Sequence, residues 1–265
     1  MKEIMKAAFQ GKEYEFTCKN TYAEALKAIA IIESDIPEEE KSETLVSLLW
    51  IVNHHDSDGS NSKLAGLNSM STCVCDNATC LARIKAGDTI CAHCYADAMQ
   101  RRFKWLAEHN IINGWILRNV EIRPEDFRKA FPFIGIQRFF RIESFGDVGS
   151  VLQVKNYFNL CKAFSGTQFV AWSKNHSFYA RAIAEAGKPE NLIYIASSLR
   201  INKPDLHLLE KYSFIDKLFT VYTKEYTKEN GIEINCGGRK CYECIFAGKN
   251  CYHKNGAKII NELLK

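Results

Sequence analysis

The sequence predicts an α/β protein organised around a partial, barrel-like (β/α) parallel sheet. The chain has 265 residues, of which 46% are hydrophobic, and this suits one large domain or two small ones. From residue 130 onward, apolar strand-like runs alternate with helical stretches. Such alternation is typical of a parallel sheet with right-handed crossovers. No glycine-rich phosphate loop follows a strand-like run, so the dinucleotide-binding and P-loop classes are disfavoured.

The N-terminal part is expected to form a hairpin followed by helices. Residues 3–18 alternate weakly, which predicts two short strands. Asn20-Thr21 precedes a stretch with apolar residues at helical spacing. Pro37 is placed in the first turn of a second helix, which we expect to run to about Val52. The polar residues 53–72 are predicted to form a long loop.

The alternating region contains four strand-like runs with helices between them. A helix over about residues 95–116 precedes them. The runs are, in order, FIGIQRFFRIESFGD, TQFVAWSKN, NLIYIASS and LFTVYTKEY. The expected helices are VLQVKNYFNLCKAF, SFYARAIAEAG and PDLHLLEKYSFID.

Charged side chains at the ends of the first two runs are candidate catalytic residues. In (β/α) architectures the chemistry takes place at the carboxyl ends of the strands, and buried strands seldom end in charges that have no partner. The candidates are Arg141, Glu143, Asp147 and Lys174. The alternative is that these residues are helix caps and solvated loop starts.

Cysteine is the unusual residue of this chain. Nine of the eleven cysteines fall within two short windows. No signal peptide or apolar membrane span is apparent, which predicts a cytoplasmic protein whose thiols stay reduced. Clustered cysteines in a reducing compartment indicate metal or cluster ligands. The net charge of +4 is too small to argue by itself for nucleic-acid binding.

The first window offers three thiolates, Cys80, Cys91 and Cys94. Three cysteines leave one iron of a [4Fe-4S] cube without a protein ligand, so that iron could bind a small molecule. Alternatively, Cys73 and Cys75 could complete a four-thiolate zinc site with Cys91 and Cys94.

The second window offers four thiolates within sixteen residues. They are Cys236, Cys241, Cys244 and Cys251. Both a structural zinc ion and a second [4Fe-4S] cluster accept this spacing. We therefore divide the chain into an N-terminal hairpin and helices (1–55), a barrel-like core with the first window (56–230), and a C-terminal cysteine cluster and helix (231–265).

The order of several short motifs resembles the gene product 88 family of phage and prophage proteins. The resemblance covers residues 60–260. The motifs are Asn61-Ser62-Lys63 leading through Gly66 to the first window, Cys91-x2-Cys94-Tyr95-Ala96, FRIESFGD, FVAWSKN, Cys241-x2-Cys244 and Cys251-Tyr252. The resemblance implies a barrel-like, iron–sulfur-binding protein.

The chain is also distantly similar to radical S-adenosylmethionine enzymes, which have three cysteines, a helix, and a strand ending in a glycine–acid turn. It departs from their pattern, because ten residues separate Cys80 from Cys91 where they have three. Phe145-Gly146-Asp147 also replaces two glycines and a glutamate. These departures argue against S-adenosylmethionine as a cofactor.

The leading hypothesis is an iron–sulfur protein whose open iron faces Arg141, Glu143 and Lys174. If it is an enzyme, redox or radical chemistry is the expected class, with Arg141 or Lys174 holding an anionic group of the small-molecule ligand. A rival hypothesis is a zinc-stabilised module that binds nucleic acid or a host protein, based on the basic and aromatic residues of 239–254.

A third hypothesis places a hydrolytic metal site in the polar loop. Its candidate ligands are His54, His55, Asp56 and Asp58. The alternative for these four residues is an ordinary solvated loop.

Overall fold

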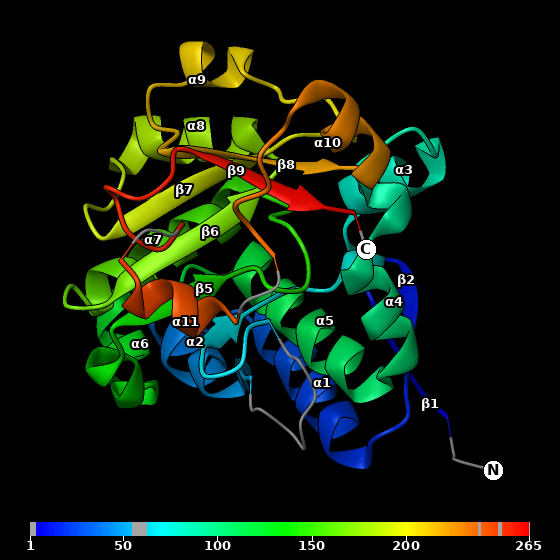
Figure 1. Cartoon of the computed structure of the whole chain (residues 1–265). Helices are drawn as coiled ribbons and strands as arrows, with labels where there is room; N and C mark the ends of the chain where they lie inside the picture. Colours follow the sequence, from blue (N-terminus) through cyan, green and yellow to red (C-terminus); the bar gives the residue numbers. More distant parts are fainter. Residues whose placement is uncertain (1–3, 55–62, 238–239, 249–250, 265) are drawn as a thin grey trace.

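A seven-stranded sheet forms the centre of the computed structural model, which describes residues 4–54, 63–237, 240–248 and 251–264 (Figure 1). The spatial order of the strands equals their order in the sequence, from β3 to β9. They are β3 (Ile51–Asn53), β4 (Asn68–Met70), β5 (Phe139–Ile142), β6 (Gln168–Ser173), β7 (Leu192–Ser197), β8 (Lys217–Tyr222) and β9 (Ile259–Leu263). Only β3 runs antiparallel to its neighbour, so the predicted α/β class with a parallel sheet is confirmed.

The sheet is open, and β3 and β9 are its two edges within the described residues. A parallel sheet whose strands follow sequence order uses crossovers of one hand, and these place the connecting helices on one face. The described residues form, on both faces and in the loops, the helices α1 (Lys19–Ile32), α2 (Glu38–Leu45), α3 (Ala78–Ala86), α4 (Tyr95–Arg102), α5 (Lys104–Asn119), α6 (Pro124–Ala130), α7 (Val151–Ala163), α8 (His176–Ala186), α9 (His207–Lys211), α10 (Lys224–Asn230) and α11 (Cys241–Phe246).

The helix-covered face carries the main hydrophobic core. Phe140 and Ile142 of β5 and Tyr194 of β7 pack in one cluster with buried residues of α5, α7 and α8. Side chains alternate between the two faces of a strand, so Phe139 and Arg141 point the other way. Phe139 belongs to a second, smaller cluster with residues of α11. The C-terminal cysteine segment therefore covers the opposite face of the sheet, where Figure 1 shows α11 in front of the strands.

The predicted N-terminal hairpin is confirmed as β1 (Met5–Phe9) and β2 (Lys12–Phe16). Its apolar side chains surround Trp115 of α5, with ring centroids of Phe9 and Tyr14 at 4.9 and 4.8 Å. The hairpin and α1 thus join the main core, and residues 1–55 also supply β3 to the central sheet.

Three expected boundaries differ in the structure. The helix expected to run to Val52 ends at Leu45, and a 3₁₀ turn then leads into β3. The expected loop 53–72 contains β4, which pairs in parallel with β5. The helix expected over 95–116 is divided at Phe103 into α4 and α5. Strand β9 was not expected either, and β3, β4 and β9 each form by pairing with another segment of the chain.

Candidate site at the carboxyl edge of the sheet

Glu143 follows β5 directly and forms several hydrogen bonds at the carboxyl edge of the sheet. The residue is buried and has a positive φ of 55°, which is uncommon for a residue other than glycine. Its carboxylate accepts hydrogen bonds from Thr72 N (3.1 Å) and Oγ1 (2.9 Å), Gln153 Nε2 (2.7 Å) and Tyr157 OH (2.7 Å). Burial raises the pKa of Glu143 to about 7. These hydrogen bonds connect Glu143 to the end of β4 and to α7.

Asp147 connects the ends of β5 and β6. Its carboxylate accepts a hydrogen bond from the Ser173 hydroxyl and from the backbone N–H groups of Val148 (2.8 Å) and Lys174 (3.0 Å). The Arg83 guanidinium of α3 lies 3.6 Å from the same carboxylate. Asp147 therefore positions Lys174 and brings α3, with its Cys80, to this edge.

The thiols of the first window gather at the same edge. Cys80 lies in the first turn of α3, and Cys91 and Cys94 lie in one turn, where Cys94 N donates to Cys91 O (3.1 Å). Burial, Asp147 and Cys91 raise the pKa of the Cys80 thiol. Burial also raises the pKa of the Cys94 thiol, and the charge of Lys174 opposes this shift. The structure thus brings Asp147 and Lys174 to these three cysteines.

Cys73 and Cys75 interact mainly with each other. Their thiols are hydrogen-bonded, and this contact raises the pKa of Cys73 and lowers that of Cys75. Cys73 Sγ also lies 3.3 Å from Gln100 Oε1, and Lys12 Nζ donates to Cys75 O (3.0 Å). This pair therefore faces the N-terminal hairpin and α4.

Arg141 lies on the opposite face of β5 from the helices, among residues of both windows. Its guanidinium carbon is 3.8 Å from the centroid of the Trp172 ring, and its Nε donates no hydrogen bond within the described chain. Burial alone would lower the pKa of Arg141, but the nearby Tyr252, Tyr95 and Cys241 raise it. The structure therefore places Arg141 near Cys241 and near Tyr95, the residue after Cys94, rather than beside Glu143.

The four thiols of the second window lie close enough to affect one another. Burial, Cys241 and Cys236 raise the pKa of Cys251 to about 12. Burial raises the pKa of Cys241, and Cys236 and Cys244 raise it further. The segment is fixed by backbone hydrogen bonds from Cys241 N to Lys63 O (2.7 Å) and from Cys236 N to Asn261 O (3.0 Å).

Two lysines that the sequence analysis did not assign to a cysteine site face these thiols, although Lys63 belongs to the Asn61-Ser62-Lys63 motif. Lys63 Nζ donates to Cys236 Sγ (3.2 Å) and pairs with Glu262. Lys217 is fully buried on β8 and donates to Ala257 O (3.0 Å). Burial lowers the pKa of Lys217, and the nearby Cys251 thiol opposes this shift. A buried lysine among strand residues was the one available sequence signal, but its neighbours in space are distant along the chain.

No three Cys, His, Asp or Glu side chains in the described ranges are arranged to hold a single metal ion. This arrangement does not match a ready zinc site. In a [4Fe-4S] cube each thiolate binds a different iron, so the sulfurs stand further apart than around one ion. Three thiols in one window and four in the other match the number of cysteines that can ligate such a cube.

His54 is buried at this edge, and its Nε2 lies 2.9 Å from Ser69 Oγ. Its proposed co-ligands His55, Asp56 and Asp58 lie outside the described residues. Burial, and then the charge of Arg141, lower the pKa of His54 to about 4. The imidazole is therefore neutral at pH 7.

His54→Gln should reduce the loss of stability in mild acid. When folding lowers the pKa of a histidine, the unfolded protein binds a proton at a higher pH than the folded protein does. The free energy of unfolding therefore falls as the pH drops from about 6.5 to about 4. Between pH 7 and pH 5 this costs about 2 kcal/mol in the parent protein. Glutamine keeps the hydrogen bond to Ser69 without titrating, so urea unfolding at the two pH values should show a smaller difference. An equal pH dependence in the variant would contradict the assignment.

The fold and the site define an α/β protein with an open, mostly parallel sheet and two cysteine-rich segments, one at the carboxyl edge and one on the face opposite the main helices. The chain belongs to the gene product 88 family, whose model matches residues 37–262. The match confirms the resemblance and extends it N-terminally from residue 60. No curated protein and no solved structure matches the chain. None of the described helices has the length and apolar character needed to cross a membrane.

Proposed function

We propose that this protein is an iron–sulfur protein that binds a [4Fe-4S] cluster through Cys80, Cys91 and Cys94. The iron without a cysteine would be open to a small-molecule ligand. The observation that carries the proposal is the meeting of three thiols with Lys174 and Asp147 where parallel strands end. Ligands of α/β proteins bind at this edge, outside the carboxyl ends of the strands.

The second window is proposed to hold a separate centre, a [4Fe-4S] cluster or a zinc ion. Four thiolates around Zn²⁺ or a cube leave a net negative charge, which is costly to bury without nearby cations. Lys63, Arg141 and Lys217 supply such cations next to Cys236, Cys241 and Cys251. Their placement supports thiolate ligands at this position.

When bound, a [4Fe-4S] cluster supplies one-electron redox chemistry, so a redox or radical reaction is the proposed class if the protein is an enzyme. The residues of the chain hold the surroundings in place. Glu143 and Asp147 fix the turn after β5, and Asp147 also holds the backbone of Lys174. Lys174 is then available for an anionic group of the ligand. The departures from the radical S-adenosylmethionine pattern leave that cofactor out of the proposal.

Anaerobic purification with iron and sulfide analysis tests the proposal. We expect a coloured protein with about four iron atoms and as many sulfides for each cluster bound. Cys80→Ser and Cys94→Ser should each lower the iron content by one cluster. Cys241→Ser should leave the first cluster intact. Cys18→Ser, which lies outside both windows, is the matched control and should bind as much iron as the parent.

Two outcomes would contradict the proposal. Colourless protein that contains stoichiometric zinc after anaerobic reconstitution would favour the zinc-stabilised binding module instead. Equal iron loss in the Cys18→Ser control would show that iron binds to thiols without regard to the windows.

A further inference from the structure

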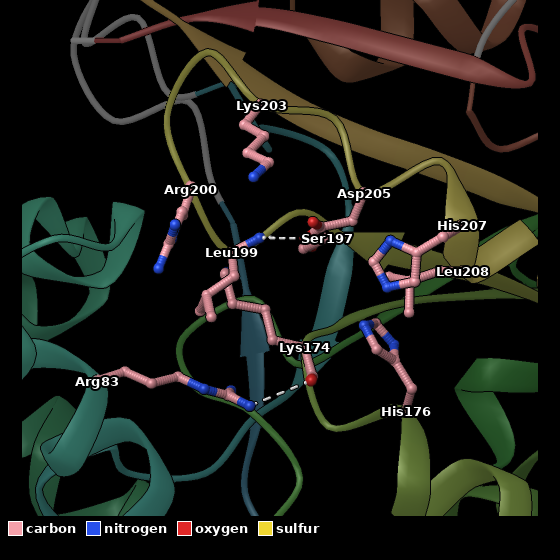
Figure 2. Close-up of a pocket in the computed structure, with 10 residues that line it drawn as sticks. All are labelled: Arg83, Lys174, His176, Ser197, Leu199, Arg200, Lys203, Asp205, His207 and Leu208. Atoms are coloured by element: carbon pink, nitrogen blue, oxygen red, sulfur yellow. Dashed lines mark hydrogen bonds between the residues drawn. The ribbon is translucent and has the colours of Figure 1, made fainter.

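We propose that a basic pocket beside the first cysteine window binds the phosphate group of a small molecule. The pocket has a volume of about 360 Å³ and opens at the carboxyl ends of β6 and β7 (Figure 2). This volume is at the lower end of the range for ligand sites, roughly 300–1,000 Å³. The proposal names a ligand class for the site put forward above, but it rests on the cavity and its charges, and it holds whether or not a cluster binds.

Basic side chains from three separate segments line this pocket. Four are permanently charged at neutral pH and two are histidines, and the lining contains a single carboxylate, Asp205. The basic residues are Arg83, Lys174, His176, Arg200, Lys203 and His207. Within the described chain, Lys174 and Lys203 have no salt-bridge partner, and Arg200 lies 3.4 Å from Asp88 in a pair that is more than half exposed. Exposed pairs of this kind contribute little, so the cations remain available to a ligand.

Asp205 forms hydrogen bonds mainly within its own loop. Its carboxylate accepts a hydrogen bond from Leu199 N (2.9 Å), and its backbone N–H donates to Ser198 Oγ (3.0 Å). Leu199 O accepts from Ile90 N (2.9 Å), in the turn that carries Cys91. The loop that presents Arg200 and Lys203 is therefore held in place from within and is fixed to the first window.

Arg83 closes the opposite wall, where contacts with the ends of β5 and β6 fix its guanidinium. Its Nη2 donates to Asn175 Oδ1 (2.8 Å) and Lys174 O (3.2 Å), the latter drawn in Figure 2. Its Nη1 is buried and makes no hydrogen bond within the described residues, but it lies 3.6 Å from the Asp147 carboxylate. A guanidinium held in this way is oriented before a ligand arrives, which lowers the entropy cost of binding.

Helix α8 also begins at this pocket, with His176 as its first residue. Burial, and then the charges of Arg83, Lys174 and His207, lower the pKa of His176 to about 4, and Asp205 opposes the shift. The charges that face His176 are therefore mainly positive, and the dipole at the N-terminus of α8 acts in the same sense.

A phosphate monoester suits this arrangement better than a carboxylate. It carries up to two negative charges and three acceptor oxygens. These oxygens can accept hydrogen bonds from cations that surround the phosphate group. Arg83 and Lys174 approach from one wall, and Arg200 and Lys203 belong to the β7–α9 loop (Figure 2). The small volume favours a small phosphorylated molecule over a nucleic-acid strand, which needs an extended groove.

Calorimetric titration of the full chain with pyrophosphate and inorganic phosphate, at constant ionic strength set with chloride, tests the proposal. We expect saturable binding that Arg200→Ala/Lys203→Ala weakens at least tenfold. Both residues are exposed, so this variant should fold normally. Lys27→Ala/Lys104→Ala removes the same charge at exposed positions outside the pocket and should bind like the parent. Cys80→Ser should lose iron but keep phosphate binding, which separates this proposal from the iron–sulfur proposal.

Three outcomes would overturn it. The first is no saturation in the parent chain, and the second is equal weakening in both double variants, which would mean that net charge alone attracts the anion. The third is a single-stranded oligonucleotide that displaces phosphate through Arg200 and Lys203, because the site would then belong to a nucleic-acid surface.

Discussion

Glu143→Ala should destabilise the protein by about 3 kcal/mol or more, since four side-chain or backbone donors buried around the carboxylate would lose their acceptor. These donors belong to Thr72, Gln153 and Tyr157. Urea unfolding followed by circular dichroism measures the effect. Glu229→Ala, at an exposed position of α10, is the control and should stay within about 0.5 kcal/mol of the parent.

The destabilisation by Glu143→Ala should also depend on pH. The folded pKa of Glu143 is about 7, above the ordinary value of 4.5. A carboxyl group whose pKa is raised on folding binds its proton more tightly in the native state, so its contribution to stability falls as the pH rises from about 4.5 to about 7. The difference between parent and variant should therefore be larger at pH 4.5 than at pH 7.5. A difference that grows with pH would show that the carboxylate is stabilised in its ionised form.

Gly146→Ala should be the most damaging small substitution in this turn. A Cβ at this position would lie 2.4 Å from Thr72 O and 2.9 Å from Glu143 Oε2, and the φ of 159° is unfavourable for a side chain. The Thr72 carbonyl is backbone and cannot move away without disturbing the end of β4. We expect a loss of about 2–3 kcal/mol, typical of overpacking.

Gly166→Ala provides the matched control for Gly146. A Cβ at Gly166 meets no atom within 4 Å, and this residue has no positive φ. The control should be neutral or stabilise the chain by less than about 1 kcal/mol, because alanine restricts the unfolded state. Equal midpoints of urea unfolding for Gly146→Ala and the control would contradict the close approach between Gly146 and the Thr72 carbonyl.

Both variants act on the turn that carries the candidate site. Thr72 immediately precedes Cys73 and the first window, and Asp147 reaches Arg83 and Lys174 from the end of the same turn. A Gly146→Ala protein that still folds should therefore show weaker pyrophosphate binding than the parent. This arrangement links the stability of the turn to the geometry of the pocket.

Local pattern was enough to predict much of the fold. The hairpin, the four long strands and the helices between them follow from periodicity, because each apolar face must be buried and the spacing of its residues is recorded in the sequence. The family and the grouping of the cysteines also follow from the sequence, since both depend on residue order. Lys174 and Asp147 follow predicted strand-like runs, and in the structure they meet where β5 and β6 end.

The short strands could not be predicted in this way. β3 and β4 have three residues each, and residues 68–70 are Asn, Ser and Met, so their local preference for a strand is weak. They form because β5 offers hydrogen-bond partners to β4, and β4 to β3. β9 likewise depends on β8, which lies more than thirty residues earlier in the sequence.

By itself, the sequence determined the α/β class, the family, the two groups of thiols and the charged ends of the strands. The tertiary structure alone decided that Arg141 faces the second window, that Lys63 and Lys217 lie beside its thiols, and that Arg83, Lys174 and Arg200 surround one pocket. The physical reason is that periodicity reports which face of an element is buried. Which charges meet across that face depends on strand order and on loops from distant parts of the chain.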